Sequence, residues 1–439
     1  MKRLPFLWLL FASFLFGPIS LEAQSTPPTE SPRVFCLSRA GLADVKERLA
    51  RNDPALQPSL RRLLREADQA MDVGPYSVVL KSRTPPSGNK HDYTSVNPYT
   101  WPDPSKPDGL PYIRRDGYTN PEWWQDFDRV PFERLAQAAE ALALAYTFTG
   151  KDTYAYRAAH LIRIWFLDPD TAMNPDLEFS QVVPGASTGF AQVIDTRFMP
   201  RIVDAIGLLA GSKAWTEKDQ AGMVSWFSKF IPNVRARADK EYRDHPHNIA
   251  SFYHAQMASM ALFIGDDAQA KELIGRTHFR LDKAVEADGF FFRERRRTRS
   301  LSYSSFHLFA LYNLATMSPL VGVDIWNFKT PDSRGLRLAL DTVAAHAGPY
   351  PPASWPLAET GKTPGDWWDP YHDQLPVVLY QAAIVYGEKS YEGQAAKILG
   401  SKEAMTENLI YLLCGLQLPG QQSMSGWLFH PSSVDPEAK

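Results

Sequence analysis

Residues 132–166 read FERLAQAAEALALAYTFTGKDTYAYRAAHLIRIWF, and this stretch decides the fold class. In its first half, 132–149, apolar residues recur at helical spacing until Gly150, a residue type that commonly ends helices. Its second half, 153–166, has the same spacing. The apolar residues that define that spacing are Tyr156, Ala159, Leu161 and Ile164. Two such helices with a short joint are expected to pack as an antiparallel hairpin.

The rest of the chain repeats this pattern. Further amphipathic segments follow near 198–209, 220–230, 249–264, 268–287, 302–317, 335–347, 374–386 and 393–399. Almost no strand-type alternation separates them, and no fixed-period repeat favours a solenoid. We therefore predict an all-α protein with an (α/α) toroid fold, an incomplete barrel of helical hairpins whose long loops line a cleft.

Composition excludes several classes of protein. The chain has 439 residues, and its 47 Lys and Arg against 49 Asp and Glu give a formal net charge of -2. Nucleic-acid binding requires a dominant cationic surface, so no nucleic-acid partner is expected. Two cysteines, Cys36 and Cys414, are too few for a disulfide framework or a multi-cysteine zinc module. Whether they pair with each other is left open.

The N-terminus predicts export. Lys2 and Arg3 precede an apolar run at 4–16, and a small-residue exit follows at Ala23, as in a secretory signal peptide. The expected divisions are a signal peptide at 1–23, a linker at 24–34 and a single domain at 35–439. An uncleaved N-terminal anchor is the alternative. We expect a periplasmic or secreted monomer without membrane contact once the signal is cleaved, because no later stretch is long and apolar enough to span a bilayer.

A cluster of five arginines lies between Arg293 and Arg299, immediately before a predicted helix. A basic run is usually a solvated face, but a local cationic patch on a chain without net positive charge suggests an anionic ligand. Tyr303 falls in the first turn of that helix, near Arg297. A nearby guanidinium favours the phenolate, so we expect Arg297 to lower the pKa of Tyr303 and to make it a candidate base.

A second cluster, His245-Pro246-His247-Asn248, opens the predicted helix at 249–264. Backbone N–H groups and side-chain amides at a helix start can bind an anion. His247 and His254 are seven residues apart and share a helix face. A zinc site would need further ligands that this segment lacks, so no metal is expected. For His254, a buried and hydrogen-bonded structural role is the alternative.

Several motifs resemble a known family. In the loop region they are Lys90-His91-Asp92-Tyr93, Asn97-Pro98-Tyr99-Thr100-Trp101-Pro102-Asp103-Pro104, Gly109-Leu110-Pro111-Tyr112 and Asp116-Gly117. Further along they are Pro184-Gly185, Ile194-Asp195-Thr196, Arg297-Thr298-Arg299-Ser300 and Tyr303-Ser304. Together they resemble alginate-lyase-like polysaccharide lyases over roughly residues 75–390. The branch they resemble most is polysaccharide lyase family thirty-eight, related to family five, which holds alginate and glucuronan lyases.

The resemblance implies an anionic polysaccharide substrate, no cofactor, and metal-independent β-elimination. Donors stabilise the enolate-like dianion while a base takes the C5 proton and an acid protonates the departing O4. An Asn-Asn-His-type triplet of the family matches this chain at Asn248, whereas His247 replaces the first Asn and Ile249 replaces the His. The resemblance therefore implies catalytic roles for Tyr303, Arg297, Asn248 and His247. Tyr303 acting as both base and acid favours mannuronate or glucuronate linkages over guluronate.

Substrate-binding residues are expected in the same motifs. They are His91, Tyr93, Tyr99, Trp101, Arg299 and His254. Aromatic rings on loops above a rigid scaffold can stack on sugar rings. Further candidates for stacking are Trp123, Trp124, Trp367 and Trp368, and we expect at least half of the candidate aromatic residues to be packing residues instead.

Three alternatives stay open. One of His245, His247 or His254 could take the role of the missing His. A toroid glycoside hydrolase would use a carboxylate pair, but no pair stands out among Asp92, Asp195, Glu294 and Asp366. A non-catalytic carbohydrate-binding relative that has lost the catalytic His would bind sugar without turnover. Product spectra separate a lyase, which leaves a C4–C5 double bond, from a hydrolase.

Overall fold

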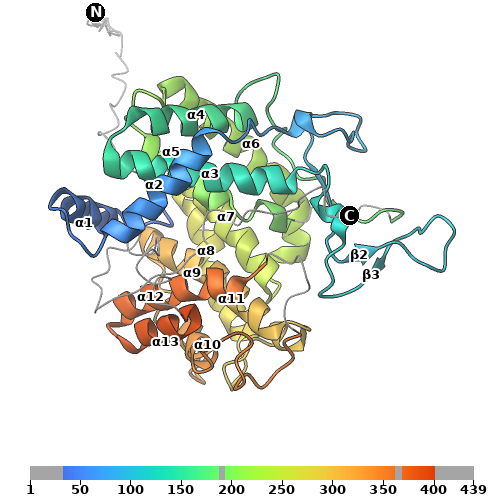
Figure 1. The fold of residues 1–439 in the computed structure, drawn as a ribbon. Coiled ribbons are helices and arrows are strands. Elements are labelled where there is room, and N and C mark those ends of the chain that lie inside the picture. The colour runs from blue at the N-terminus through green and yellow to red at the C-terminus, as the bar shows by residue number, and fades with distance from the viewer. Residues whose placement is uncertain (1–32, 187–192, 361–367, 401–439) are drawn as a thin grey trace, which may run out of the picture. The chain divides into compact units, whose positions relative to one another are not determined.

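A computed structural model describes residues 33–186, 193–360 and 368–400 (Figure 1). The expected signal peptide, most of the expected linker, Asp366, Trp367 and Cys414 lie outside these residues. The α-helices are α1 (Arg39–Ala50), α2 (Gln57–Met71), α3 (Arg129–Thr149), α4 (Asp152–Phe166), α5 (Met199–Leu209), α6 (Glu217–Tyr242), α7 (Asn248–Ile264), α8 (Asp267–Ala284), α9 (Ser300–Met317), α10 (Leu336–Ala344), α11 (Pro370–Asp373), α12 (Leu375–Tyr386) and α13 (Ser390–Leu399). None of the described helices is long and apolar enough to cross a membrane.

Every second helix from α3 to α9 packs against the next in that series. Helix α3 packs on α5, α5 on α7 and α7 on α9, and α9 packs in turn on α12. Helices α7 and α9 are apolar around most of their circumference and are buried along nearly their whole length, as expected for helices inside a core. The intervening helices α4, α6 and α8 keep exposed faces and pack on the outside of this row. This arrangement is the predicted (α/α) toroid, and the predicted fold class is confirmed.

The hairpin quoted above forms α3 and α4. Gly150 ends α3 in the left-handed conformation, with φ 69°, where a side chain would be strained. On α4 the inward face differs from the expected one, because Tyr156 is 49% exposed and Ile164 is only half-buried. The segment carries apolar residues on more than one face, so periodicity alone does not settle which face packs on α3. The residues that are buried are Tyr154, Ala155, Ala158, Ala159, Leu161, Ile162, Trp165 and Phe166.

Four short strands, which the sequence pattern did not predict, attach the loop region to the helices. Strand β1 (Thr94–Val96) pairs in parallel with β4 (Phe179–Val182). Strand β2 (Thr100–Trp101) pairs antiparallel with β3 (Ile113–Arg114), and Figure 1 labels this second pair. They are two to four residues long, too short for alternation to show in the sequence. The pairing of β1 with β4 holds the loop after α2 beside the segment that precedes α5.

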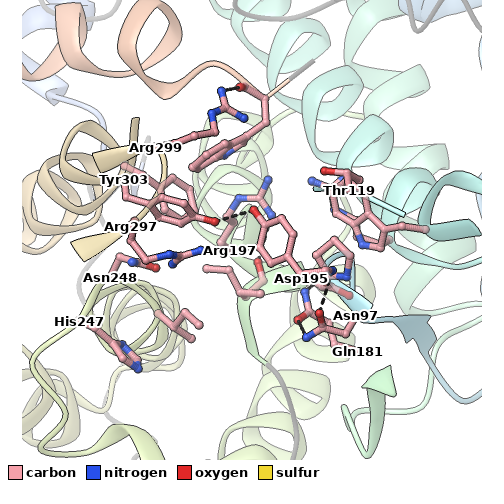
Figure 2. Close-up of a pocket in the computed structure, with 18 of the residues that line it drawn as sticks. Asn97, Thr119, Gln181, Asp195, Arg197, His247, Asn248, Arg297, Arg299 and Tyr303 are labelled. Atoms are coloured by element: carbon pink, nitrogen blue, oxygen red, sulfur yellow. Dashed lines mark hydrogen bonds between the residues drawn. The ribbon is translucent and has the colours of Figure 1, made fainter. Parts of the chain in front are cut away.

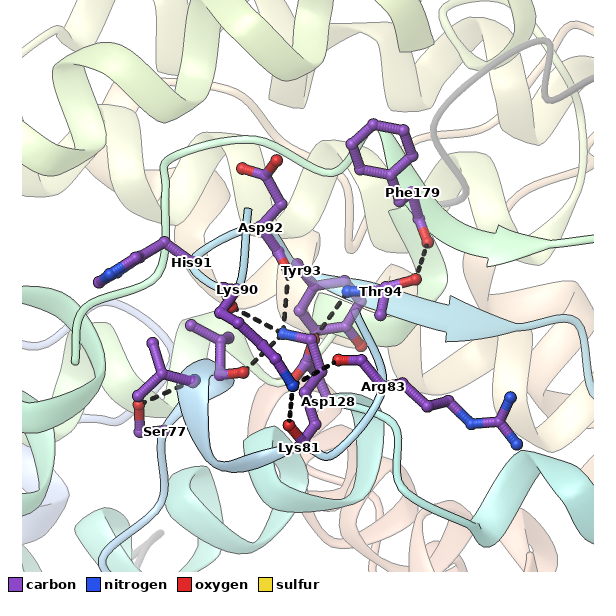
Figure 3. Close-up of polar contacts among 12 residues, drawn as sticks. Ser77, Lys81, Arg83, Lys90, His91, Asp92, Tyr93, Thr94, Asp128 and Phe179 are labelled. Carbon is purple, nitrogen blue, oxygen red and sulfur yellow. Dashed lines mark hydrogen bonds and ion pairs between the residues drawn. The ribbon is translucent and has the colours of Figure 1, made fainter. Parts of the chain in front are cut away.

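A buried lysine, Lys81, and a half-buried one, Lys90, fold this loop on itself (Figure 3). The ammonium group of Lys81 donates to the backbone carbonyls of Val78, Lys90 and Asp92 at 2.6–3.0 Å. It also pairs with Asp128 at 2.9 Å, just before α3, and Asp128 accepts from the backbone N–H of Thr94 in β1. The ammonium group of Lys90 donates back to the carbonyls of Lys81, Ser82 and Arg83. These contacts fix the start of β1 relative to α3.

Candidate active site

A cavity of about 320 Å³ opens at the amino ends of four inner helices (Figure 2). It is lined at the start of α3 by Arg129, just before α5 by Arg197, at the start of α7 by Asn248, and in the first turn of α9 by Tyr303. Helix amino ends carry partial positive charge and free backbone N–H groups. The toroid therefore directs the positive ends of four helices at one cavity, which favours an anionic ligand.

Charged side chains reinforce this field. Among the described residues, the lining includes five arginines, namely Arg114, Arg129, Arg197, Arg297 and Arg299, and two carboxylates, Asp195 and Glu241. The net charge of the whole chain therefore hides a cationic cavity.

The sequence cluster at 293–299 contributes only part of that charge. Arg297 and Arg299 line the cavity, but Arg295 pairs with Glu286 and Asp288 outside it. The other lining arginines come from three distant segments. The expected single basic patch is thus divided by the backbone, because the short η4 helix (Glu294–Arg296) turns successive side chains in different directions.

Two tyrosine hydroxyls meet inside the cavity. The hydroxyl oxygens of Tyr99 and Tyr303 are 2.5 Å apart, and either can donate the hydrogen bond. Tyr303 is only 5% exposed. Its ring packs against Trp368, with 4.7 Å between ring centroids. A hydrogen bond thereby joins a loop residue and a helix residue that are far apart in the sequence (Figure 2).

Arg297 does act to lower the pKa of Tyr303, as expected, but other effects outweigh it. The Arg297 guanidinium carbon lies 3.5 Å from the centroid of the Tyr303 ring, over its face, and the guanidinium donates to both oxygens of Asp116 at 2.8 and 3.1 Å. Burial and the neighbouring Tyr99 raise the pKa of Tyr303 well above its usual range, and Arg297 offsets this only in part. Tyr303 is therefore a protonated phenol at neutral pH.

Asn248 is held at the cavity wall by a buried carboxylate. One oxygen of Glu294 accepts from the backbone N–H of Asn248 at 3.0 Å and from its side-chain Nδ2 at 2.9 Å. His307 Nδ1 lies 3.0 Å from the same oxygen, and His307 Nε2 contacts the Ser251 hydroxyl at 2.8 Å. Burial opposes ionisation of Glu294, but His307 and Asn248 hold its pKa below its usual value. The second Nδ2 hydrogen of Asn248 has no acceptor among the described residues and is available to a ligand.

His247 caps α7 and acts as a neutral donor. The backbone N–H of Ala250 donates to its Nδ1 at 3.2 Å, so the ring proton lies on Nε2. Burial lowers the pKa of His247 to about 3, and His245, with ring centroids 4.0 Å apart, adds to this. His247 lines the cavity, where it can donate a hydrogen bond but carries no positive charge at neutral pH.

Two of the expected substrate-binding residues are structural in this arrangement. His254 is fully buried in α7, where its Nδ1 lies 2.8 Å from a guanidinium nitrogen of Arg280. Tyr93 is 1% exposed and donates to Asp195 at 3.2 Å. Neither His254 nor Tyr93 lines the cavity, and other residues of the same segments face it instead.

His91 and Trp101 also lie outside the cavity lining. His91 Nδ1 contacts the backbone carbonyl of Ala172 at 2.7 Å, and Trp101 Nε1 donates to the carbonyl of Tyr118 at 2.9 Å. Both side chains hold loop segments together. Tyr99 and Arg299, by contrast, do line the cavity, as do the tryptophans Trp123 and Trp368.

The carboxylates considered for hydrolysis do not form a pair. Glu294 is 1% exposed and is engaged with Asn248, and Asp92 bonds to Ser87 and Asn174 away from the cavity. Asp195 lines the cavity but is fully buried and already accepts hydrogen bonds. Within the described part of the chain, the geometry of an acid–base carboxylate pair is not present.

Sequence reasoning missed Gln181 and Arg197. Gln181 adopts a left-handed backbone, φ 49°, which is costly for a residue with a side chain and often marks a functional site. The strain is held by two hydrogen bonds, from its Nε2 to Asp195 and from its backbone N–H to Ser95, each 2.7 Å long. Arg197 directly follows the Ile194-Asp195-Thr196 motif, which was the one sequence signal that could have identified it.

The fold is a helical toroid, and its cationic cavity holds an amide donor and a tyrosine pair, which suits an anionic ligand. The profile of the alginate lyase family matches residues 77–355. A crystal structure of an alginate lyase from Bacteroides ovatus is similar with a TM-score of 0.80 and 33% identity, covering 88% of this chain and 100% of that one. The chain belongs to the alginate lyase family and is a polysaccharide lyase.

Other alginate lyase structures match with lower scores. Alginate lyase A1-III from Sphingomonas species A1 matches with a TM-score of 0.44 and 14% identity, covering 66% of this chain and 78% of that one. A tyrosine-to-phenylalanine variant of alginate lyase A1-III complexed with tetrasaccharide matches at 0.49 and 15% identity, covering 72% and 78%. None of the curated proteins matches the chain.

Proposed function

We propose that this protein cleaves mannuronate- or glucuronate-type linkages of a uronate-containing polysaccharide by metal-independent β-elimination, leaving a 4,5-unsaturated uronate. The observation that carries the proposal is the contact between the Tyr99 and Tyr303 hydroxyls inside a cationic cavity. We further propose that the protein works as a monomer in the periplasm or outside the cell, which rests on the N-terminal sequence pattern alone.

The chemistry follows from these positions. The Tyr303 phenolate takes the C5 proton, the C5 electron pair forms the C4–C5 double bond, and O4 leaves with the proton that Tyr303 then returns. This restores the phenolate. Tyr99 holds the hydroxyl oxygen of Tyr303 in place through their hydrogen bond. The free amide hydrogen of Asn248 and Nε2–H of His247 stabilise negative charge that grows on the substrate carboxylate. One residue can serve both steps only where the C5 hydrogen and O4 lie on the same face.

The test is product formation on a substrate panel. Purified protein is incubated with polymannuronate, polyguluronate, glucuronan and glycosaminoglycans, and ultraviolet absorbance follows the unsaturated product. Absorbance growth on polymannuronate or glucuronan that exceeds growth on polyguluronate supports the proposal. New reducing ends without ultraviolet absorbance would identify a hydrolase instead.

The activity should rise with pH. Because burial raises the pKa of Tyr303, the reactive phenolate is a small fraction at neutral pH and increases as the solution becomes more alkaline. We expect kcat/KM to increase by about tenfold per pH unit above neutrality until the enzyme loses stability. His247, whose pKa is lowered to about 3, contributes no titration near neutral pH. A kcat/KM that is independent of pH from about 7 to about 9 contradicts Tyr303 as the base.

The carboxylate behind Asn248 should matter for turnover. Glu294→Gln keeps the shape but removes the charge that orients Asn248 and His307. We expect kcat to fall by about a hundredfold, because small displacements of a positioned group have effects of this size. Steady-state kinetics measure it, with Glu286→Gln, a carboxylate outside the cavity, as the matched control. Equal kcat for the two variants would remove Glu294 from this role.

A further inference from the structure

Arg197 stands out among the cavity residues because no described carboxylate pairs with it. Its Nη1 donates to the backbone carbonyl of Ile194 at 3.1 Å, and its buried Nε has no hydrogen-bond partner. A guanidinium has five N–H donors, and only one of those of Arg197 finds an acceptor among the described residues. The hydrogen-bonding capacity of this guanidinium is therefore mostly unused by the described residues.

The neighbours of Arg197 do not neutralise it. Three guanidinium groups surround the Phe198 ring, with carbon-to-centroid distances of 4.1 Å for Arg197, 5.7 Å for Arg201 and 6.0 Å for Arg129. Arg129 pairs with Glu133, and Arg201 lies 3.5 Å from Glu140. Arg197, the third cation around this ring, has no such carboxylate partner among the described residues.

The pKa of Arg197 shows the cost of leaving this cation unpaired. Burial and the nearby Arg129 lower that pKa to about 9, although Asp195 and Glu133 act in the opposite direction. The guanidinium is still charged at neutral pH. Partly buried charges are costly unless they are paired, so an unpaired cation at a cavity wall is typical of a site that receives an anion.

The remaining lining arginines outside this cluster already have acceptors. Arg297 donates to Asp116, as does Arg114. Arg299 donates to the carbonyl of Trp368. Arg197 lines the same cavity as the Tyr99–Tyr303 pair and lies just before the amino end of α5 (Figure 2). It combines an unpaired charge, free donors and a position in the cavity that holds the tyrosine pair.

We propose that Arg197 binds the carboxylate of a uronate residue of the substrate and thereby selects acidic sugars over neutral ones. This rests on the proposed function and names a specificity-determining residue for it. Binding satisfies the free N–H groups and supplies the missing negative charge, and the planar guanidinium can hold both oxygens of a carboxylate. Arg197 is a binding residue here and moves no proton.

The test separates binding from turnover. In a Tyr303→Phe background, calorimetry measures the affinity for a uronate oligosaccharide and for its carboxyl-reduced, neutral counterpart, with and without Arg197→Gln. We expect Arg197→Gln to weaken uronate binding by about 30-fold or more and to change binding of the neutral oligosaccharide much less. Arg296→Gln, an arginine that does not line the cavity, is the matched control and should leave both affinities unchanged.

Two further readouts exclude a structural role. Thermal unfolding of Arg197→Gln should occur at the same temperature or a higher one, because the substitution removes an unpaired charge. With Tyr303 intact, KM should rise while kcat and its pH profile stay close to those of the parent protein.

The inference is overturned by unchanged uronate affinity, by equal loss for acidic and neutral oligosaccharides, or by a shifted pH profile of kcat at constant KM. A parent protein that binds uronates through Arg197 but releases no unsaturated product would refute the proposed function alone.

Discussion

Replacing Tyr303 with phenylalanine should reduce the release of unsaturated product by about a thousandfold. The substitution removes the one oxygen that we propose takes the C5 proton and returns it to O4. It keeps the ring, which packs against Trp368 and beneath Arg297. The loss should therefore appear in kcat, measured by ultraviolet absorbance, while affinity for the oligosaccharide changes little.

The matched control lies on the same helix. Tyr312→Phe removes a hydroxyl from a buried tyrosine of α9 that does not line the cavity around Tyr303, and we expect near-normal turnover. Tyr99→Phe is informative as well, because it removes the hydrogen bond to Tyr303 but not the base, and it should leave partial activity. If Tyr303→Phe retains the parent kcat, Tyr303 is neither base nor acid and the proposed mechanism fails.

Replacing Lys81 with methionine should lower the free energy of unfolding by about 3–5 kcal/mol. Lys81 is 7% exposed, and its removal leaves Asp128, which is 1% exposed, without its cation. Three backbone carbonyls also lose a donor. Urea unfolding followed by tryptophan fluorescence measures the change. Because these contacts anchor β1, turnover should also decrease as Tyr99 becomes less well placed.

Removing both charges of the Lys81–Asp128 pair should be less harmful than removing one. In Lys81→Met/Asp128→Asn no unpaired buried charge remains, so the double variant should be more stable than Lys81→Met alone. Burial already raises the pKa of Asp128 to about 7 with Lys81 present. Without Lys81 it rises further, so Asp128 binds a proton more tightly in the folded than in the unfolded state. The stability of Lys81→Met should therefore decline as pH rises above the ordinary carboxyl pKa. A double variant no more stable than the single one would contradict this account.

The control for the lysine experiment is Lys90→Met. Lys90 donates only to backbone carbonyls and is less buried, so its loss leaves no buried carboxylate unpaired. We expect a smaller decrease in stability than for Lys81→Met. Equal effects of the two substitutions would mean that closing the loop, and not pairing the charge of Asp128, is what stabilises the fold.

The sequence by itself determined the fold class and much of the cavity. Helical periodicity and helix-ending Gly150 are local properties, so the hairpins could be predicted before their packing was known. The sequence placed three cavity residues at the starts of predicted helices, namely Tyr303, Asn248 and His247. In a toroid the inner helices run in the same direction, so their amino ends meet. Residues at the starts of different helices therefore come together in space.

Only the tertiary structure decided which charges act there and in what protonation state. Arg197 and Gln181 reach the cavity through pairing and packing between segments far apart in the chain, which leave no periodic signal. The pKa of Tyr303 depends on burial and on Tyr99, and these outweigh the neighbouring arginine that sequence reasoning relied on. Proximity in sequence shows which charges are available, but desolvation and partner geometry, which decide their effect, arise only when the helices come together.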